Sequence, residues 1–181
     1  MILEIYLNDF NGVERTIEKP KKMIEWYKVE RSGKKWEVNP MLVGTFEHKF
    51  DNKGRIVLPS KFRDELGESA VATVGIDRCV SIYSAERWQE LLNRFHQMSF
   101  SKGKTRDFLR VLLATANEIQ FDASGRALIP SNLRQHAKLE LEVSVIGVGD
   151  HVELWDTTSW NTYLEEIRNV LPDIAEEVEG L

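Results

Sequence analysis

The chain has 181 residues, of which 42% are apolar and 29% are charged, and its formal net charge is −5. These values are typical of one or two small globular domains, and no apolar run is long enough for a membrane span. The four histidines do not have the spacing of a metal site and Cys79 has no partner, so no metal or cofactor is expected. A lone cysteine can form no internal disulfide, which predicts a reducing cytoplasm. Because the balance is acidic, any binding to nucleic acid must depend on local basic clusters.

Residues 1–40 differ from the rest of the chain. They carry eight basic and seven acidic side chains and show no clear apolar period. Nothing in them matches the pattern that follows. We therefore interpret them as an N-terminal extension.

A fourteen-residue segment occurs twice, as Phe50–Arg63 and Phe121–Arg134, with seven identical positions. Apolar and tryptophan positions beyond each copy repeat as well. An internal repeat of this kind predicts two similar halves related by a pseudo-twofold axis. The predicted organisation is a first half at 44–98, a helical link at 99–116, a second half at 117–171 and a frayed acidic tail at 172–181.

Each copy begins with a turn of the form Asp-x-x-Gly-Arg. An aspartate side chain can accept hydrogen bonds from nearby backbone amides, and glycine tolerates positive φ, so a type I turn with a bulge is expected. Serine after proline then predicts a helix N-cap. The turn-structuring residues are Asp51, Gly54, Asp122 and Gly125, and the expected caps are Ser60 and Ser131, before helices at 61–66 and 132–139.

The remaining apolar patterns predict an α+β protein. Strands are expected at 41–50, 70–76, 80–83, 141–148 and 152–155. Amphipathic helices are expected at 85–98, 105–116 and after residue 156, with Ser84 capping the first and Asp156 or Thr157 the last.

The candidate site is a two-pronged basic surface that both turns form. Arginine is suited to bidentate contact with phosphate or with guanine. The alternative is an Asp–Arg ion pair within each turn, and both can hold together. The candidate DNA-binding residues are Arg55, Arg126, Lys53, Arg63 and Arg134.

Catalysis is not expected. Asp51 and Asp122 are related by the repeat, but an aspartic-protease dyad needs Thr-Gly or Ser-Gly after each aspartate. Here Asn-Lys and Ala-Ser follow. No nucleophile elbow or phosphate-binding glycine loop is present.

The duplicated DNKGR and DASGR turns, the PSKFR and PSNLR segments and the two tryptophan-bearing helices resemble the MraZ family, over residues 41–171. These are two-copy members of the AbrB/SpoVT DNA-binding superfamily. The resemblance implies swapped-hairpin β-barrel lobes and a ring-shaped homo-oligomer. It also implies a cytoplasmic, nucleoid-associated transcriptional regulator. Its partner would be double-stranded DNA, at direct repeats in the promoter of the division and cell-wall gene cluster that includes its own gene. Arg55 and Arg126 match the family's DNA-binding arginines.

The family's chains begin close to the position of Met41. Trp36-Glu37 must be encoded by TGGGAR, and synonymous codons around it can supply a second TGGGA about one DNA turn away. Other synonymous codons there can supply a ribosome-binding sequence just before Met41. We therefore hypothesise that 1–40 is translated leader, with a genuine extension as the alternative.

The leading function is thus a DNA-binding regulator of its own operon. An AbrB-like antitoxin, or a non-catalytic oligomeric interaction protein, is the alternative. Antitoxins of that type are usually single-copy with a disordered tail, which the duplication argues against.

Overall fold

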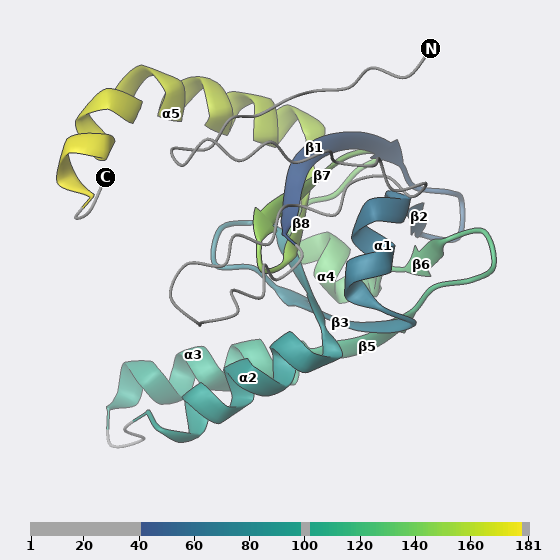
Figure 1. The fold of residues 1–181 in the computed structure, drawn as a ribbon, viewed down its shortest axis with the longest axis horizontal. Helices are drawn as coiled ribbons and strands as arrows, with labels where there is room; N and C mark the ends of the chain where they lie inside the picture. Colours follow the sequence, from purple (N-terminus) through teal and green to yellow (C-terminus); the bar gives the residue numbers. More distant parts are fainter. Residues whose placement is uncertain (1–40, 99–101, 179–181) are drawn as a thin grey trace, which may run out of the picture. The chain divides into compact units, whose positions relative to one another are not determined.

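The computed structural model describes residues 41–98 and 102–178, so the predictions for residues 1–40 lie outside the described residues. The described part is a mixed α+β fold, as predicted from the sequence (Figure 1). The strands are β1 (Leu42–Lys49), β2 (Arg55–Val57), β3 (Ser69–Val74), β4 (Val80–Ser84), β5 (Asn117–Gln120), β6 (Arg126–Leu128), β7 (Glu142–Gly149) and β8 (Val152–Asp156). The helices are α1 (Ser60–Leu66), α2 (Ala85–His96), α3 (Gly103–Ala114), α4 (Ser131–His136) and α5 (Thr157–Glu177).

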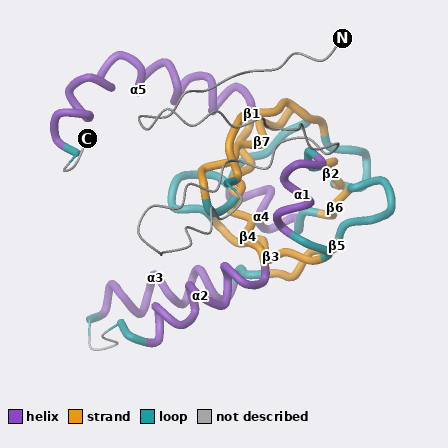
Figure 2. The backbone as a smooth tube through the Cα atoms, viewed as in Figure 1, coloured by secondary structure: helices purple, strands orange, loops and turns teal. Residues whose placement is uncertain are grey.

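The strands of the two repeats interleave. Six of them form one antiparallel sheet in the order β1-β7-β8-β4-β3-β5, and β2 and β6 form a separate two-stranded ribbon (Figure 2). β1 of the first repeat pairs with β7 of the second, and β5 of the second repeat pairs with β3 of the first. Each repeat therefore completes its sheet with a strand from the other repeat.

The register of two strand pairs defines a local twofold axis. In the β2–β6 ribbon, Ile56 lies opposite Ala127, its own equivalent in the second repeat. Between β4 and β8, Ser81 lies opposite its equivalent, Glu153. Antiparallel strands that pair equivalent residues with each other are related by a twofold axis through that pair. The pseudo-symmetry expected from the sequence is thus present in the backbone pairing.

The core follows the same symmetry. Its central side chains come in equivalent pairs from the two repeats and are shielded completely from solvent. They are Ile56, Leu58 and Phe62 in the first repeat and Ala127, Ile129 and Leu133 in the second. Burial of large apolar side chains stabilises the fold by roughly 1.5–3 kcal/mol each. This shared core holds β2 and β6 together, and with them the two turns that precede these strands.

The predicted serine caps of α1 and α4 are wrong. Pro59 and Pro130 occupy the N-cap positions, and neither helix has a side-chain cap hydrogen bond. The Pro59 carbonyl accepts hydrogen bonds from the amides of Phe62 and Arg63, at 2.9 and 3.0 Å. Ser60 is consequently the first helical residue. The caps at Ser84 and Asp156 are confirmed, since their side chains accept from Arg87 and Ser159 amides.

The C-terminal helix is longer than the sequence predicts. α5 continues through Glu177 with Pro172 inside it, so the prediction of a frayed chain is wrong for residues 172–177. Proline removes one helical hydrogen bond and commonly bends a helix. In Figure 1 the helix bends in its yellow C-terminal part. Ala175, Glu176 and Glu177 have high helix propensity, which favours continuation beyond the proline.

Helices α2 and α5 bury little of their own surface, whereas α3 buries Leu109 and Leu112. Within the described residues, α2 and α5 contain no fully buried side chain. Phe95 of α2 and Phe108 of α3 meet edge to face at 6.4 Å. The Thr73 hydroxyl of β3 donates to the Leu112 carbonyl at 2.7 Å, which fixes the end of α3 against the sheet.

Candidate nucleic-acid interface

The first Asp-x-x-Gly-Arg turn is organised by one carboxylate. Asp51 Oδ1 accepts from the backbone amides of Lys53 and Arg55, each at 2.9 Å. Its Oδ2 accepts from Arg55 Nε at 2.7 Å. The Gly54 amide closes the turn onto the Asp51 carbonyl at 3.0 Å, and Gly54 has φ +77°. These hydrogen bonds match the expected turn with a bulge, and they fix the arginine side chain at its Nε end.

The second turn repeats this arrangement. Asp122 Oδ1 accepts from the amides of Ser124 and Arg126 at 2.9 and 3.0 Å, and its Oδ2 accepts from Arg126 Nε at 2.8 Å. Gly125 has φ +72° and donates to the Asp122 carbonyl at 2.7 Å. The Asp–Arg ion pair, one of the two alternatives raised by the sequence, is thus present in both turns.

Both carboxylates are stabilised in their ionised form. The Arg55 amide is the main cause that lowers the pKa of Asp51 to about 2, against the opposing effect of burial. The Arg126 amide likewise lowers the pKa of Asp122. Hydrogen bonds to a charged carboxylate favour ionisation. At neutral pH each turn therefore holds a charged Asp–Arg pair.

The ribbon behind the turns presents a mixed basic and apolar face. Because strand residues alternate between faces, Ile56 and Ala127 point into the core while their neighbours point outward. The register places Arg55 opposite Leu128 and Val57 opposite Arg126. The aliphatic side chains are 39% (Val57) and 56% (Leu128) exposed. Our sequence analysis missed these two residues, although the alternation in RIV and RAL signals them.

Lys53 is exposed at the tip of the first turn, where the second turn has the neutral Ser124. Arg63 and Arg134 are placed differently from Arg55 and Arg126. All four arginines are partly buried, but Arg63 and Arg134 each donate from Nε to a backbone carbonyl at the end of the preceding strand segment. Arg63 donates to Leu58 and Arg134 to Ile129, both at 3.1 Å. The predicted arginines therefore divide into a pair held by turn aspartates and a pair held by backbone carbonyls.

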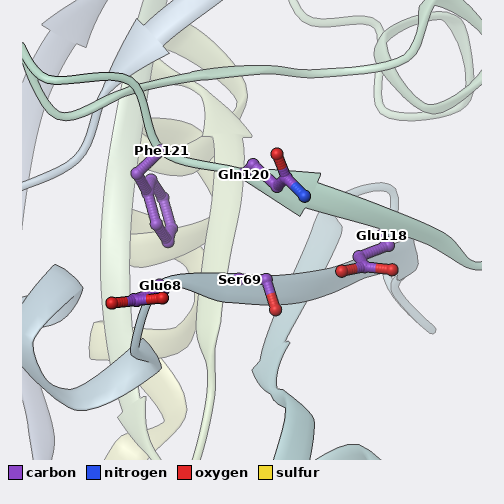
Figure 3. A pocket seen from close by; sticks show the side chains of 5 residues that line it. All are labelled: Glu68, Ser69, Glu118, Gln120 and Phe121. Atoms are coloured by element: carbon purple, nitrogen blue, oxygen red, sulfur yellow. The ribbon is translucent and has the colours of Figure 1, made fainter.

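A shallow hollow lies at the edge of the sheet, where β3 begins and β5 ends. Figure 3 shows its lining side chains, which are Glu68, Ser69, Glu118, Gln120 and Phe121. The lining carries two carboxylates and no basic group, so its charge opposes phosphate binding. We do not assign nucleic acid to this hollow.

Another charged cluster joins α2 to the turn between β7 and β8. Arg87 forms an ion pair with Asp150, and the His151 Nδ1 lies 2.7 Å from Asp150 Oδ1. His151 Nε2 lies 3.5 Å from Glu153, and its ring stacks on Tyr83 at 4.7 Å. In the described ranges, no group of acidic, histidine or cysteine side chains is arranged to hold a metal ion. No helix within those ranges has the length and apolar character needed to cross a membrane.

Comparisons with known proteins identify the family. A family model described as "MraZ protein, putative antitoxin-like" matches twice in tandem, at residues 41–111 and 112–178.

The chain is 43% identical to a protein of Thermoanaerobacter sp. (strain X514) over 141 residues, which cover 78% of this chain and 99% of the relative. It is 42% identical to one of Caldanaerobacter subterraneus subsp. tengcongensis over 140 residues, 77% of this chain and 98% of the relative. A protein of Halothermothrix orenii is 39% identical over 141 residues, again 78% and 99%. All three relatives are named "Transcriptional regulator MraZ". The tandem family match and these relatives show that the chain belongs to the MraZ family.

Proposed function

We propose that this chain is a transcriptional regulator that binds double-stranded DNA with the β2–β6 ribbon and its two turns. The observation that carries the proposal is the pair Arg55 and Arg126. They are equivalent residues, fixed by equivalent carboxylates, on one solvent-facing ribbon. The relatives' names support a role in transcription.

The chemistry of this face suits DNA. A two-stranded antiparallel ribbon fits the major groove, where arginine can contact guanine with two hydrogen bonds. The exposed Val57 and Leu128 between the arginines suit apolar contact with thymine methyl groups. Lys53 adds a positive charge at the tip of the first turn. The acidic balance of the whole chain does not oppose this binding, because Lys53, Arg55 and Arg126 lie together on the ribbon and its turns.

The proposal includes an oligomer that acts on repeated sites. The family resemblance supports a ring-shaped homo-oligomer that binds direct repeats in the promoter of the division and cell-wall gene cluster, in the cytoplasm and at the nucleoid. The exchange of strands between the repeats supports swapped-hairpin lobes. The helices contribute exposed apolar side chains that suit contacts between subunits; they include Phe108, Val111, Val170 and Leu171. Several subunits on one DNA would multiply a modest affinity per turn.

A salt titration tests the proposed function. The full chain is used to select a short duplex from a random pool, and binding is measured by fluorescence anisotropy from low to moderate salt. Release of counterions predicts that log K falls linearly with log salt, by about 0.9 per phosphate contacted. A scrambled duplex of the same composition should bind more weakly at every salt concentration. Failure to enrich any duplex, or equal affinity for the scrambled one, would contradict the proposal.

A further inference from the structure

The two turns are joined by reciprocal backbone hydrogen bonds. The Leu58 amide of the first repeat donates to the Gly125 carbonyl of the second at 3.2 Å. The Ile129 amide of the second repeat donates to the Gly54 carbonyl of the first at 3.1 Å. Each turn glycine is therefore tied to the strand end of the opposite repeat.

Arginine side chains reinforce the same connection. A Cβ atom added at Gly54 would lie 2.8 Å from Arg134 Cζ, and one added at Gly125 would overlap the guanidinium group of Arg63. Both glycines also have positive φ. Glycine is favoured at these turns by its backbone conformation, and its missing side chain leaves the space into which the opposite guanidinium group reaches.

The anchoring of each guanidinium group explains its position. Arg63 Nε donates to the Leu58 carbonyl, and the amide of the same Leu58 donates to the Gly125 carbonyl. Arg134 Nε donates to the Ile129 carbonyl in the equivalent way. Arg134 also lies 5.7 Å above the Phe50 ring, directly before the first turn. Each of these guanidinium groups is thus held by its own backbone and lies against the opposite turn, whereas Arg55 and Arg126 are held by the carboxylates of their own turns.

We propose that Arg63 and Arg134 are positioning residues, each of which holds the DNA-contacting turn of the other repeat. This inference rests on the proposed function and deepens it. Arg134 sets the turn at residues 51–55, and Arg63 sets the turn at residues 122–126. The two turns then act as one unit with a fixed spacing, because neither can move without displacing the side chain of the other repeat.

Salt dependence separates positioning from contact. Arg63→Ala and Arg134→Ala should each lower affinity for the selected duplex by about tenfold, the scale of one displaced bidentate contact. Their salt slope should equal that of the wild type, because no phosphate contact is removed. Arg55→Ala, which removes a base contact, should relax the preference for guanine at the contacted position, whereas Lys53→Ala, which removes a phosphate contact, should reduce the slope by about one per bound subunit. Arg78→Ala, an exposed arginine in another turn, is the matched control and should change neither quantity.

Folding is monitored in the same variants. Circular dichroism and light scattering should show a folded protein of wild-type assembly at the temperature of the binding measurement. If Arg63→Ala does not fold, Arg63→Gln is used, since its amide can still donate to the Leu58 carbonyl without the guanidinium plane. A slope reduced as in Lys53→Ala, or wild-type affinity in a folded Arg63 variant, would overturn the proposal.

A second measurement needs no DNA. In full-length protein labelled with 15N-glycine, Arg63→Lys should shift the Gly125 amide resonance and leave Gly54 unchanged. Arg134→Lys should do the opposite. If the wild type selects no duplex but this crossed pattern appears, the proposed function fails while the contact between repeats stands. Shifts confined to other glycines would overturn the inference in either case.

Discussion

Arg55 of the first repeat reaches Asp122 of the second, with Nη1 3.8 Å from Oδ2, while it keeps its closer pair with Asp51. Asp122 thus faces arginines from both repeats, because Arg126 Nε also donates to it at 2.8 Å. The two turns consequently share charge across the pseudo-twofold axis.

The depressed pKa of Asp51 predicts a specific pH dependence of stability. Its folded pKa of about 2 is below the ordinary value of 3.8. A depressed folded pKa contributes stability above the unfolded value, and this contribution is lost as pH falls through the folded pKa. Carbon-13 NMR of labelled aspartate should therefore show Asp51 still ionised at pH 3. Asp51→Asn should melt with a weaker dependence on pH between about 4 and 2. Titration of Asp51 near 3.8 would contradict the hydrogen-bonded turn.

The His151 cluster predicts the opposite trend near neutrality. Burial lowers the pKa of His151, but the hydrogen bonds to Glu153 and Asp150 outweigh it, so the net shift is upward from 6.5. A raised folded pKa gives stability that is complete below 6.5 and is lost as pH rises through the folded pKa. The melting temperature should fall as pH rises from about 6.5 to 8. His151→Gln should show a smaller fall, and an equal fall in both proteins would remove this assignment.

The exposed apolar positions on the helices predict where subunits meet. Val111 of α3 is 54% exposed and Leu171 of α5 is 52% exposed in the single chain. Val111→Glu or Leu171→Glu should reduce the size of the assembly, because a charge buried in an interface is costly, while helix content stays constant. Ile76→Glu is the control, at a position 87% exposed in a turn. Light scattering that gives wild-type size for both helix variants would exclude these faces from the interface.

Residues 1–40 lie outside both family matches, the first of which begins at Met41. The three relatives compared above are covered over 98–99% of their own length by alignments of 140 or 141 residues. A chain that begins at Met41 should therefore fold, assemble and bind the selected duplex as the full chain does. Thermal melting and anisotropy compare the two directly. A large loss of stability on deletion would show that the segment contributes to the fold.

The sequence predicted the parts of the fold that depend on local chemistry. The repeat itself, the Asp–Gly turns and the caps at Ser84 and Asp156 all follow from side chains acting within a few residues. The caps at Ser60 and Ser131 were mispredicted. There the proline before each serine, with its fixed φ, takes the cap position and leaves the serine inside the helix.

Longer-range features were harder to predict. Each repeat receives a strand, β1 or β5, from the other repeat. The pairing of β1 with β7 joins residues about one hundred positions apart in the sequence, such as Leu42 and Gly149. Arg63 and Arg134 lie against the turn of the opposite repeat, so their own sequence neighbourhood does not distinguish them from Arg55 and Arg126. Symmetry was visible in the sequence, but the contacts between the symmetric halves were not.

The affinity of Arg55→Ala for the selected duplex tests the central claim most directly. Removing one bidentate contact, worth about 1–3 kcal/mol, should weaken binding at least about fivefold at moderate salt. Arg126→Ala should act in the same direction. The melting temperature should change little, because Asp51 still accepts from the backbone amides of Lys53 and residue 55 after the side chain is removed. Arg78→Ala should bind as the wild type does. If Arg55→Ala binds the duplex with wild-type affinity and the same salt slope, the β2–β6 ribbon is not the DNA-binding surface.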